Sequence, residues 1–287
     1  MSGRLFIVAT PIGNLSDVTL RALEVLREVP LIAAEDTRLT HRLLQRHGIA
    51  TRMISYHARS TPGRLAELLD HLRGGADLAL VTDAGTPSVS DPGEDLVAAW
   101  GDEGGTVVPI PGASAVMAIV AASGVAGPRW AFEGFLPRSG RERRERLARI
   151  AADDRGTVIY EAPGRVAATL VDLAGACGSE RAGAVGRELT KLHEEVLRGT
   201  LGELADRARS GELTLRGEFA LVVGSRPERS AQDAARGADP AIALAEVERL
   251  VAAGTSRGEA ARQVAAATGI PRRRLYAAPL DRQPSRT

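Results

Sequence analysis

Short apolar runs alternate with amphipathic stretches over the first two-thirds of the chain, and this alternation limits the fold more than any other feature. Strands that are buried on both faces consist of near-continuous apolar runs, which is typical of a parallel sheet covered by helices. The first part of the chain therefore predicts an α/β domain. Its predicted strands are 4–9, 31–34, 52–56, 78–82 and 106–110, and its predicted helices are 18–28, 39–47, 62–72 and 94–100.

A Pro-Ile-Pro-Gly segment at 109–112 interrupts this alternation and predicts a hinge. A second set of apolar runs and amphipathic stretches follows it, so we expect a second α/β domain. The predicted organisation is an N-terminal domain over 1–111, a second domain over 112–224, a linker over 225–239 and a helical domain over 240–287.

The C-terminal region carries an excess of positive charge. Residues 225–287 hold 11 Arg and 7 acidic residues, whereas the rest of the chain has 26 basic and 29 acidic residues. A small-residue helix, a Thr-Gly turn ending at Gly269 and a second helix from Pro271 predict a helix-turn-helix-like fold. Arg272, Arg273 and Arg274 open the second helix, where they would face a phosphate backbone. The alternative is a small helical bundle with a solvated arginine run.

Composition excludes several classes of protein. A single cysteine, Cys177, rules out an internal disulfide and a cysteine metal cage, and the histidines share no ligand spacing, so we expect no metal. No apolar run is long enough to span a membrane, and the N-terminus lacks the pattern of a signal peptide. We therefore expect a cytoplasmic protein.

Four polar or glycine-containing loops follow predicted strands of the first domain, where open α/β sheets bind ligands. The loop around Asp83 and Gly85 is the most specific, because a carboxylate beside exposed carbonyls suits a cationic or hydroxyl-rich ligand. Glu35 and Asp36 end another strand. They could supply a base or bind substrate, although Asp36 could instead cap the following helix.

The second domain has two polar segments that also follow strands, one over 160–165 and one over 187–195. The segment over 187–195 contains Lys191, the one lysine among 37 basic residues, together with a histidine and several carboxylates. Lysine and arginine differ in geometry and in how readily they lose a proton, so a lysine in an arginine-rich chain points to a specific need for an ammonium group. A solvated charge run is the alternative.

Seven short motifs occur in order along the chain: Thr10-Pro-Ile-Gly-Asn-Leu15, Glu35-Asp-Thr-Arg38, Asp83-Ala-Gly-Thr-Pro87, Ser90-Asp-Pro-Gly93, Pro111-Gly112, Phe132-Glu-Gly-Phe-Leu-Pro137 and Glu188-Leu-Thr-Lys191. Taken together, these motifs resemble the ribosomal RNA small subunit methyltransferase I family of the tetrapyrrole methylase superfamily. One departure is Gly164, which stands where the family pattern has histidine.

The resemblance implies 2′-O-methylation of a decoding-centre cytidine in 16S rRNA of the small ribosomal subunit. It also implies that S-adenosylmethionine binds in the cleft between the two α/β lobes of the chain, and that the protein is a homodimer. We expect Glu35 or Asp36 to act as base, Lys191 to orient the ribose or to lower the pKa of its hydroxyl, and Arg38 with Arg272–Arg274 to hold phosphates. By position, the residues expected to bind the donor are Pro11, Asp83, Ala84, Gly85, Ser114, Ala115, Tyr160, Glu161, Glu188, Leu189 and Thr190.

Two other functions fit parts of the sequence. A methyltransferase acting on a tetrapyrrole would share the donor pocket but would have no use for the basic C-terminal region. A DNA-binding regulator would use the helix-turn-helix-like region to read a major groove, with the α/β lobes sensing a ligand.

Overall fold

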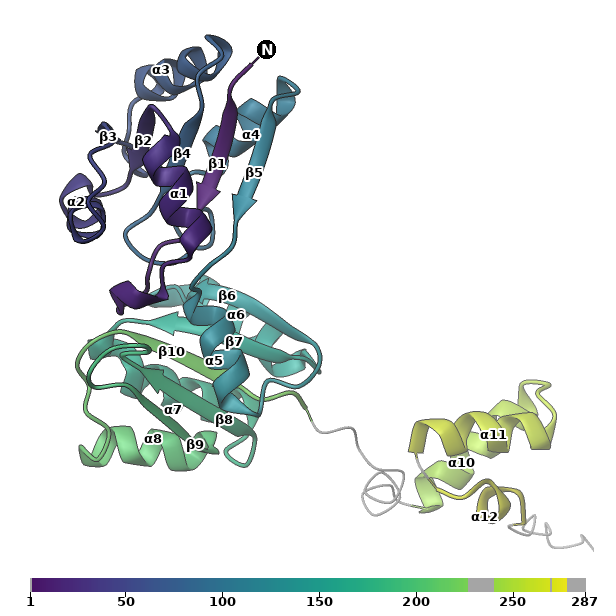
Figure 1. Ribbon diagram of the computed structural model, residues 1–287. Coiled ribbons are helices and arrows are strands. Elements are labelled where there is room, and N and C mark those ends of the chain that lie inside the picture. The colour runs from purple at the N-terminus through teal and green to yellow at the C-terminus, as the bar shows by residue number, and fades with distance from the viewer. Residues whose placement is uncertain (1, 227–239, 269, 278–287) are drawn as a thin grey trace, which may run out of the picture. The chain divides into compact units, whose positions relative to one another are not determined.

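The computed structural model describes residues 2–226, 240–268 and 270–277, and the chain forms two compact units, Met1–Arg226 and Pro227–Thr287. Of the predicted linker over 225–239, all but the first two residues lie outside the described residues, as do Gly269 and the end of the chain from 278 onward. The first unit contains two five-stranded sheets, each in a lobe of its own (Figure 1).

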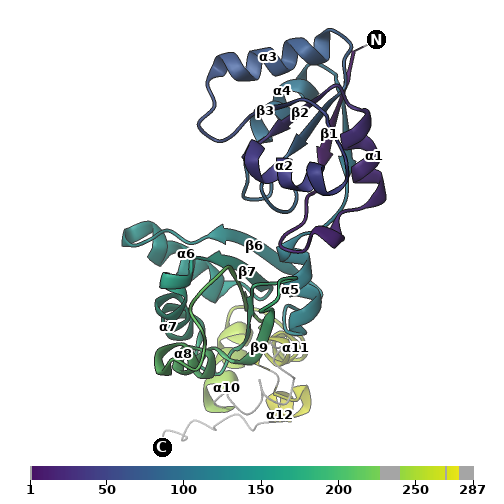
Figure 2. The ribbon, with the colours of Figure 1, turned by 60° about the vertical axis from the view of Figure 1, so that its left-hand side comes forward.

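The first lobe is a parallel sheet with helices on both faces, as the apolar runs predict. Its strands β1 to β5 pair in the order β3-β2-β4-β1-β5. Alternate residues of a strand face opposite sides, so Phe6 and Val8 pack against α1 and α2, whereas Leu5 packs against α3 and α4. Figure 2 shows helices on both faces of this sheet. The elements are β1 (Arg4–Val8), η1 (Leu15–Asp17), α1 (Leu20–Glu28), β2 (Leu31–Ala34), α2 (Thr37–Arg46), β3 (Met53–Ser55), α3 (Pro62–Arg73), β4 (Leu78–Val81), α4 (Glu94–Asp102) and β5 (Thr106–Ile110).

Capping residues set helix boundaries that periodicity alone misses. Helix α1 begins two residues later than predicted, because Thr19 accepts a hydrogen bond from the backbone N–H of Ala22. Helix α2 begins two residues earlier than predicted, because Asp36 caps it. Strand β5 includes Pro109 and lies at the edge of the sheet, where a residue without an N–H is tolerated.

The second lobe is a mixed sheet in the order β6-β7-β10-β8-β9. Only β6 and β7 are parallel within it, and the other neighbours are antiparallel. Helix α5 packs on one face, and α6, α7 and α8 pack on the other. The elements are α5 (Ala115–Ser123), β6 (Trp130–Phe135), α6 (Gly140–Ala152), β7 (Gly156–Glu161), η2 (Pro163–Arg165), α7 (Val166–Cys177), β8 (Ala182–Arg187), β9 (Glu195–Thr200), α8 (Leu201–Ser210) and β10 (Phe219–Val223).

The loop after β1 joins the two lobes. Ile12 is buried in the core of the second lobe beside Ile119 and Leu189. Thr10 and Gly85 exchange backbone hydrogen bonds of 2.8 and 3.0 Å, which ties this loop to the loop after β4. The carboxyl ends of the first sheet are thereby held against the second lobe.

The C-terminal unit is helical. It contains α10 (Pro240–Ala252), α11 (Arg257–Thr268) and α12 (Arg272–Ala277), which pack around a small apolar core that includes Val247, Val264 and Leu275. Arg272, Arg273 and Arg274 are exposed at the start of α12. None of the helices that the structure describes is long and apolar enough to cross a lipid bilayer.

Candidate active site

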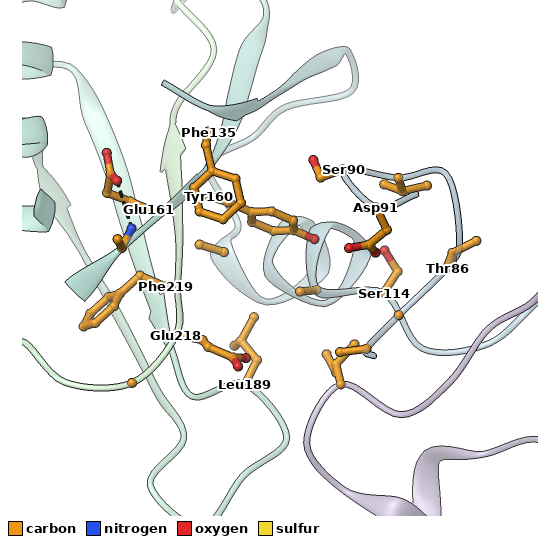
Figure 3. A pocket seen from close by; sticks show the side chains of 18 of the residues that line it. Thr86, Ser90, Asp91, Ser114, Phe135, Tyr160, Glu161, Leu189, Glu218 and Phe219 are labelled. Carbon is orange, nitrogen blue, oxygen red and sulfur yellow. Dashed lines mark hydrogen bonds between the residues drawn. The ribbon is translucent and has the colours of Figure 1, made fainter. Parts of the chain in front are cut away.

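A cavity of about 380 Å³ lies between the two lobes of the first unit, within the size range of sites for small ligands (Figure 3). The first lobe contributes Ile12 and most of the loop after β4. The second lobe contributes the start of α5, the carboxyl ends of β6 and β7, Leu189 and the start of β10. The lining residues are Ile12, Ala84, Gly85, Thr86, Val89, Ser90, Asp91, Ser114, Ala115, Phe135, Tyr160, Glu161, Ala162, Pro163, Leu189, Gly217, Glu218, Phe219 and Ala220.

The charged residues that line the cavity are all acidic. Asp91, Glu161 and Glu218 are among the lining residues, and within the described part of the chain no Arg, Lys or His joins them. Such a wall favours a cation and disfavours a phosphate.

Asp91 is the carboxylate that the cavity perturbs most. Burial, together with repulsion from the neighbouring carboxylates of Glu35 and Asp83, raises its pKa to about 6. Figure 3 shows the Asp91 carboxylate facing the Tyr160 hydroxyl and Ser114. Burial raises the pKa of Tyr160 to about 12, so its hydroxyl remains protonated and can donate a hydrogen bond at neutral pH.

Strained backbone occurs on both sides of the cavity. Four non-glycine residues of the described chain have positive φ: Ser88 and Ser90 beside Asp91, and Glu188 and Thr190 on either side of Leu189. Each such residue costs about 1–3 kcal/mol, and strain of this kind concentrates at functional sites. The two loops are thus held in conformations that their sequences do not favour.

Most of the predicted donor-binding residues come together here. Ala84, Gly85, Ser114, Ala115, Tyr160, Glu161 and Leu189 line the cavity, whereas Pro11, Asp83, Glu188 and Thr190 do not. Asp83 instead joins two loops, because its carboxylate accepts a 2.9 Å hydrogen bond from the Asp36 N–H and its own N–H donates to Glu35 at 3.2 Å.

The expectation that Glu35 or Asp36 is the base does not fit this geometry, since neither lines the cavity. Asp36 caps α2 and pairs with Arg38 at 2.6 Å, and these hydrogen bonds lower its pKa to about 2. A carboxylate of such low basicity is a poor proton acceptor. Burial raises the pKa of Glu35, whose carboxylate is bound to the Asp83 N–H.

Lys191 lies just outside the cavity, between two carboxylates. Its Nζ is 3.0 Å from Glu188 Oε1 and 3.0 Å from Glu218 Oε2. Burial lowers the pKa of Lys191, but the hydrogen bonds to these two carboxylates outweigh burial and raise it overall. Lys191 is therefore a fixed cation that links the end of β8 to the pocket-lining Glu218.

Gly13 packs directly on Lys191, so the first lobe covers this ion-pair cluster. A Cβ at Gly13 would lie 2.4 Å from Lys191 Cγ and 3.0 Å from Thr190 Oγ1. We expect Gly13→Ala to destabilise the protein by about 1–3 kcal/mol through overpacking. Gly101→Ala in α4, where nothing lies within 4 Å, is the matched control and should be neutral or stabilising. Thermal unfolding that is unchanged in Gly13→Ala would contradict this contact.

Glu161 lines the cavity but directs its carboxylate into the protein (Figure 3). It accepts hydrogen bonds from Thr169 Oγ1 at 2.7 Å and from the N–H of Ala162 at 2.8 Å, and it pairs with Arg165 at 3.2 Å. Arg143 donates to the same Thr169 hydroxyl at 2.9 Å. This buried network fixes the turn after β7, so Glu161 shapes the cavity wall through the backbone.

Sequence reasoning missed Asp91, Phe135 and Glu218 as site residues. Asp91 and Phe135 lie within motifs that carry the family resemblance, at 90–93 and 132–137, so a signal was present for these two. Glu218 carries no such signal, because its place at the cavity depends on the pairing of β10 with β7 and β8.

Comparisons with known proteins agree with this architecture. A family model described as Tetrapyrrole (Corrin/Porphyrin) Methylases matches residues 4–205. A Synechocystis protein named Ribosomal RNA small subunit methyltransferase I is 48% identical over 280 residues, which is 97% of this chain and 98% of that protein. A Bacillus subtilis protein of the same name is 38% identical, over 96% of this chain and 93% of that protein.

Solved structures share the fold at lower identity. A cobalt precorrin-4 methyltransferase superposes with a TM-score of 0.60 and 18% identity, over 77% of this chain and 94% of that one. A Thermus thermophilus uroporphyrin-III C-methyl transferase complexed with S-adenyl homocysteine gives a TM-score of 0.56 and 20% identity, over 77% of this chain and 97% of that one. The family match and the close relatives confirm the resemblance seen in the motifs, and the chain belongs to the tetrapyrrole methylase family.

Proposed function

We propose that this protein transfers a methyl group from S-adenosylmethionine to the ribose 2′-oxygen of a decoding-region cytidine in 16S rRNA. The observation that carries the proposal is the acidic cavity between the lobes, with a carboxylate of raised pKa in its wall. The name shared by the close relatives supports the small-subunit rRNA as substrate.

The cavity fits this donor in charge and in character. S-adenosylmethionine supplies, when bound, a methyl group activated by a sulfonium cation. Asp91 would stabilise the cation, since no described lining residue carries positive charge and the Glu218 carboxylate is already paired with Lys191. The apolar residues Ile12, Leu189 and Phe219 would contact the uncharged parts of the donor.

Asp91 is the residue that we assign as the proton acceptor. A ribose hydroxyl is a poor acid, and a base works best when its pKa lies near the working pH. The pKa of about 6 leaves Asp91 ionised at neutral pH yet far more basic than Asp36. Holding the hydroxyl in a near-attack position would supply much of the remaining rate enhancement, roughly 7–11 kcal/mol in favourable cases.

The C-terminal unit would hold RNA phosphates through the exposed Arg272, Arg273 and Arg274. Replacing all three with alanine should weaken RNA binding and reduce the slope of log affinity against log salt by roughly 2–3. Arg262→Ala in α11 is the control. Arg262 already pairs with Glu259 at 2.7 Å, so this substitution should change the slope less than the triple substitution does. A slope unaltered by the triple substitution would remove the phosphate role. Arg38 would contribute less, because its guanidinium is already paired with Asp36.

We also propose a homodimer in the cytoplasm. Leu192 and Met117 are exposed apolar side chains of the second lobe that a second copy would cover. Analytical ultracentrifugation of the wild type and of Leu192→Ser tests this, with a dimer expected only for the wild type.

Methyl transfer from labelled donor distinguishes the candidate substrates. Small ribosomal subunits, naked 16S rRNA and a tetrapyrrole should be assayed in parallel. Label in RNA at the ribose of a cytidine is the expected result. Label in the tetrapyrrole alone would replace the proposal with a small-molecule methyltransferase, and duplex DNA binding without methyl transfer would favour a regulator.

A further inference from the structure

Aromatic side chains are scarce in this protein, yet they gather at the cavity. The chain has 9 aromatic residues among 287, and Phe132, Phe135, Tyr160 and Phe219 all lie in or directly behind the cavity wall. The rings of Phe132 and Phe135 both contact Tyr160, with centroid separations of 4.9 and 5.7 Å. In a chain with so few aromatic rings, this clustering requires an explanation.

A local irregularity in β6 presents Phe135 to the cavity. Residues three apart in a regular strand face opposite sides, so Phe132 and Phe135 could not both reach Tyr160. The pairing of β6 with β7 shifts register between these two residues, and Gly134 has φ of +61°. Bulges of this kind re-aim a side chain beside a functional site. Gly134 is also close to the first lobe, since a Cβ there would lie 3.3 Å from Ser90 Oγ.

The ring of Phe135 is left open to solvent. Phe135 is 56% exposed, whereas Phe219 on the other side of the cavity is 4% exposed and Leu189 is 8% exposed. Tyr160 contacts the Phe135 ring, but more than half of the Phe135 surface stays uncovered. It is therefore a contact surface for something that enters from outside.

We propose that Phe135 stacks on the nucleobase of the nucleotide that is methylated. The inference rests on the proposed function and deepens it. RNA bases that are recognised one at a time are splayed out of their stack and placed on aromatic rings. A target ribose that reaches Asp91 brings its own base to the mouth of the same cavity, and Phe135 is the exposed ring there. The donor's adenine is better matched to the buried side around Phe219 and Leu189.

Four variants test the proposal by distinguishing the effect of the aromatic ring from the effect of apolar surface area. We expect Phe135→Leu and Phe135→Ala to lower kcat/KM for small ribosomal subunits by roughly 10- to 100-fold, the range of one base–aromatic stack. Phe135→Tyr should stay within a few-fold of the wild type. Leu20→Ala, which removes exposed apolar area from the start of α1 away from the cavity, should also stay within a few-fold. Donor affinity, measured by equilibrium dialysis, should change less than twofold in all four.

Each contrary outcome overturns a defined part of the proposal. A loss of donor affinity equal to the loss of kcat/KM would mean that Phe135 contacts the donor. Full activity of Phe135→Leu would mean that apolar area suffices and no stack forms. A wild-type protein that binds donor but methylates no RNA would refute the proposed function itself. Equal activity of the wild type and Phe135→Ala would refute only the stacking role of Phe135. Unchanged thermal unfolding of the variants confirms that the exposed ring is not needed for folding.

Discussion

Asp91→Asn should lower kcat for RNA methylation by about 10²- to 10⁴-fold, the usual contribution of a positioned base. The substitution keeps the shape of the side chain and removes its ability to accept a proton. Wild-type kcat should rise with pH and level off above about 6, because only the ionised form of Asp91 is active. The variant should lack this rise. Asp36→Asn, which retains the helix cap, distinguishes the two carboxylates and should stay within a few-fold of the wild type.

The same group predicts an opposite effect on stability. Because the pKa of Asp91 is raised from 3.8 to about 6, the folded state binds the proton more tightly than the unfolded state, and stability falls as pH rises through this interval. Asp91→Asn should therefore be more stable than the wild type at pH 7.5, by about 1 kcal/mol once the half-exposed position is allowed for. The difference should disappear near pH 4. A variant that is inactive and also less stable at pH 7.5 would indicate a structural role for Asp91.

Arg143→Met should destabilise the protein by about 3 kcal/mol. This is the largest stability effect that we expect from a single side chain of the buried network behind the cavity wall. Arg143 is 8% exposed and donates to Pro137 O, Thr169 Oγ1 and Asp172. Its removal takes away the buried guanidinium that donates to Thr169 and leaves Arg165 as the cation paired with Glu161.

The control for this prediction lies on the same helix. Arg141 in α6 pairs with Glu145 at the surface, and Arg141→Met should change stability by no more than about 0.5 kcal/mol. Calorimetric unfolding of the full chain compares the two. Equal melting temperatures for Arg143→Met and Arg141→Met would show that the buried network does not stabilise the second lobe.

The first lobe was predictable because its central strands β2 and β4 are buried on both faces, and continuous apolar runs such as 78–81 have few other interpretations. The second sheet was less predictable, since the residues of an apolar strand such as β10 do not indicate whether its neighbours run parallel or antiparallel. Periodicity reports burial, and pairing direction depends on connections between distant segments.

The site was predictable in its loops but not in its chemistry. Asp36, Asp83 and Asp91 all follow strands of the first lobe, and the sequence does not show which one is bound to an arginine and which one faces a cavity. The pKa of about 2 for Asp36 comes from local hydrogen bonds with Arg38, whereas the pKa of about 6 for Asp91 comes from burial in the tertiary structure. The orientation of Phe135 was hidden for the same reason, because it depends on a bulge that only Gly134 suggests.

Donor binding at the cavity tests the central claim most directly. Equilibrium dialysis of the full chain against labelled S-adenosylmethionine should show one donor bound per chain. Ala115→Trp, which fills the cavity at the start of α5, should abolish that binding. Binding that is absent from the wild type, or that persists undiminished in a correctly folded Ala115→Trp protein, would contradict the assignment of this cavity as the methyl-donor site.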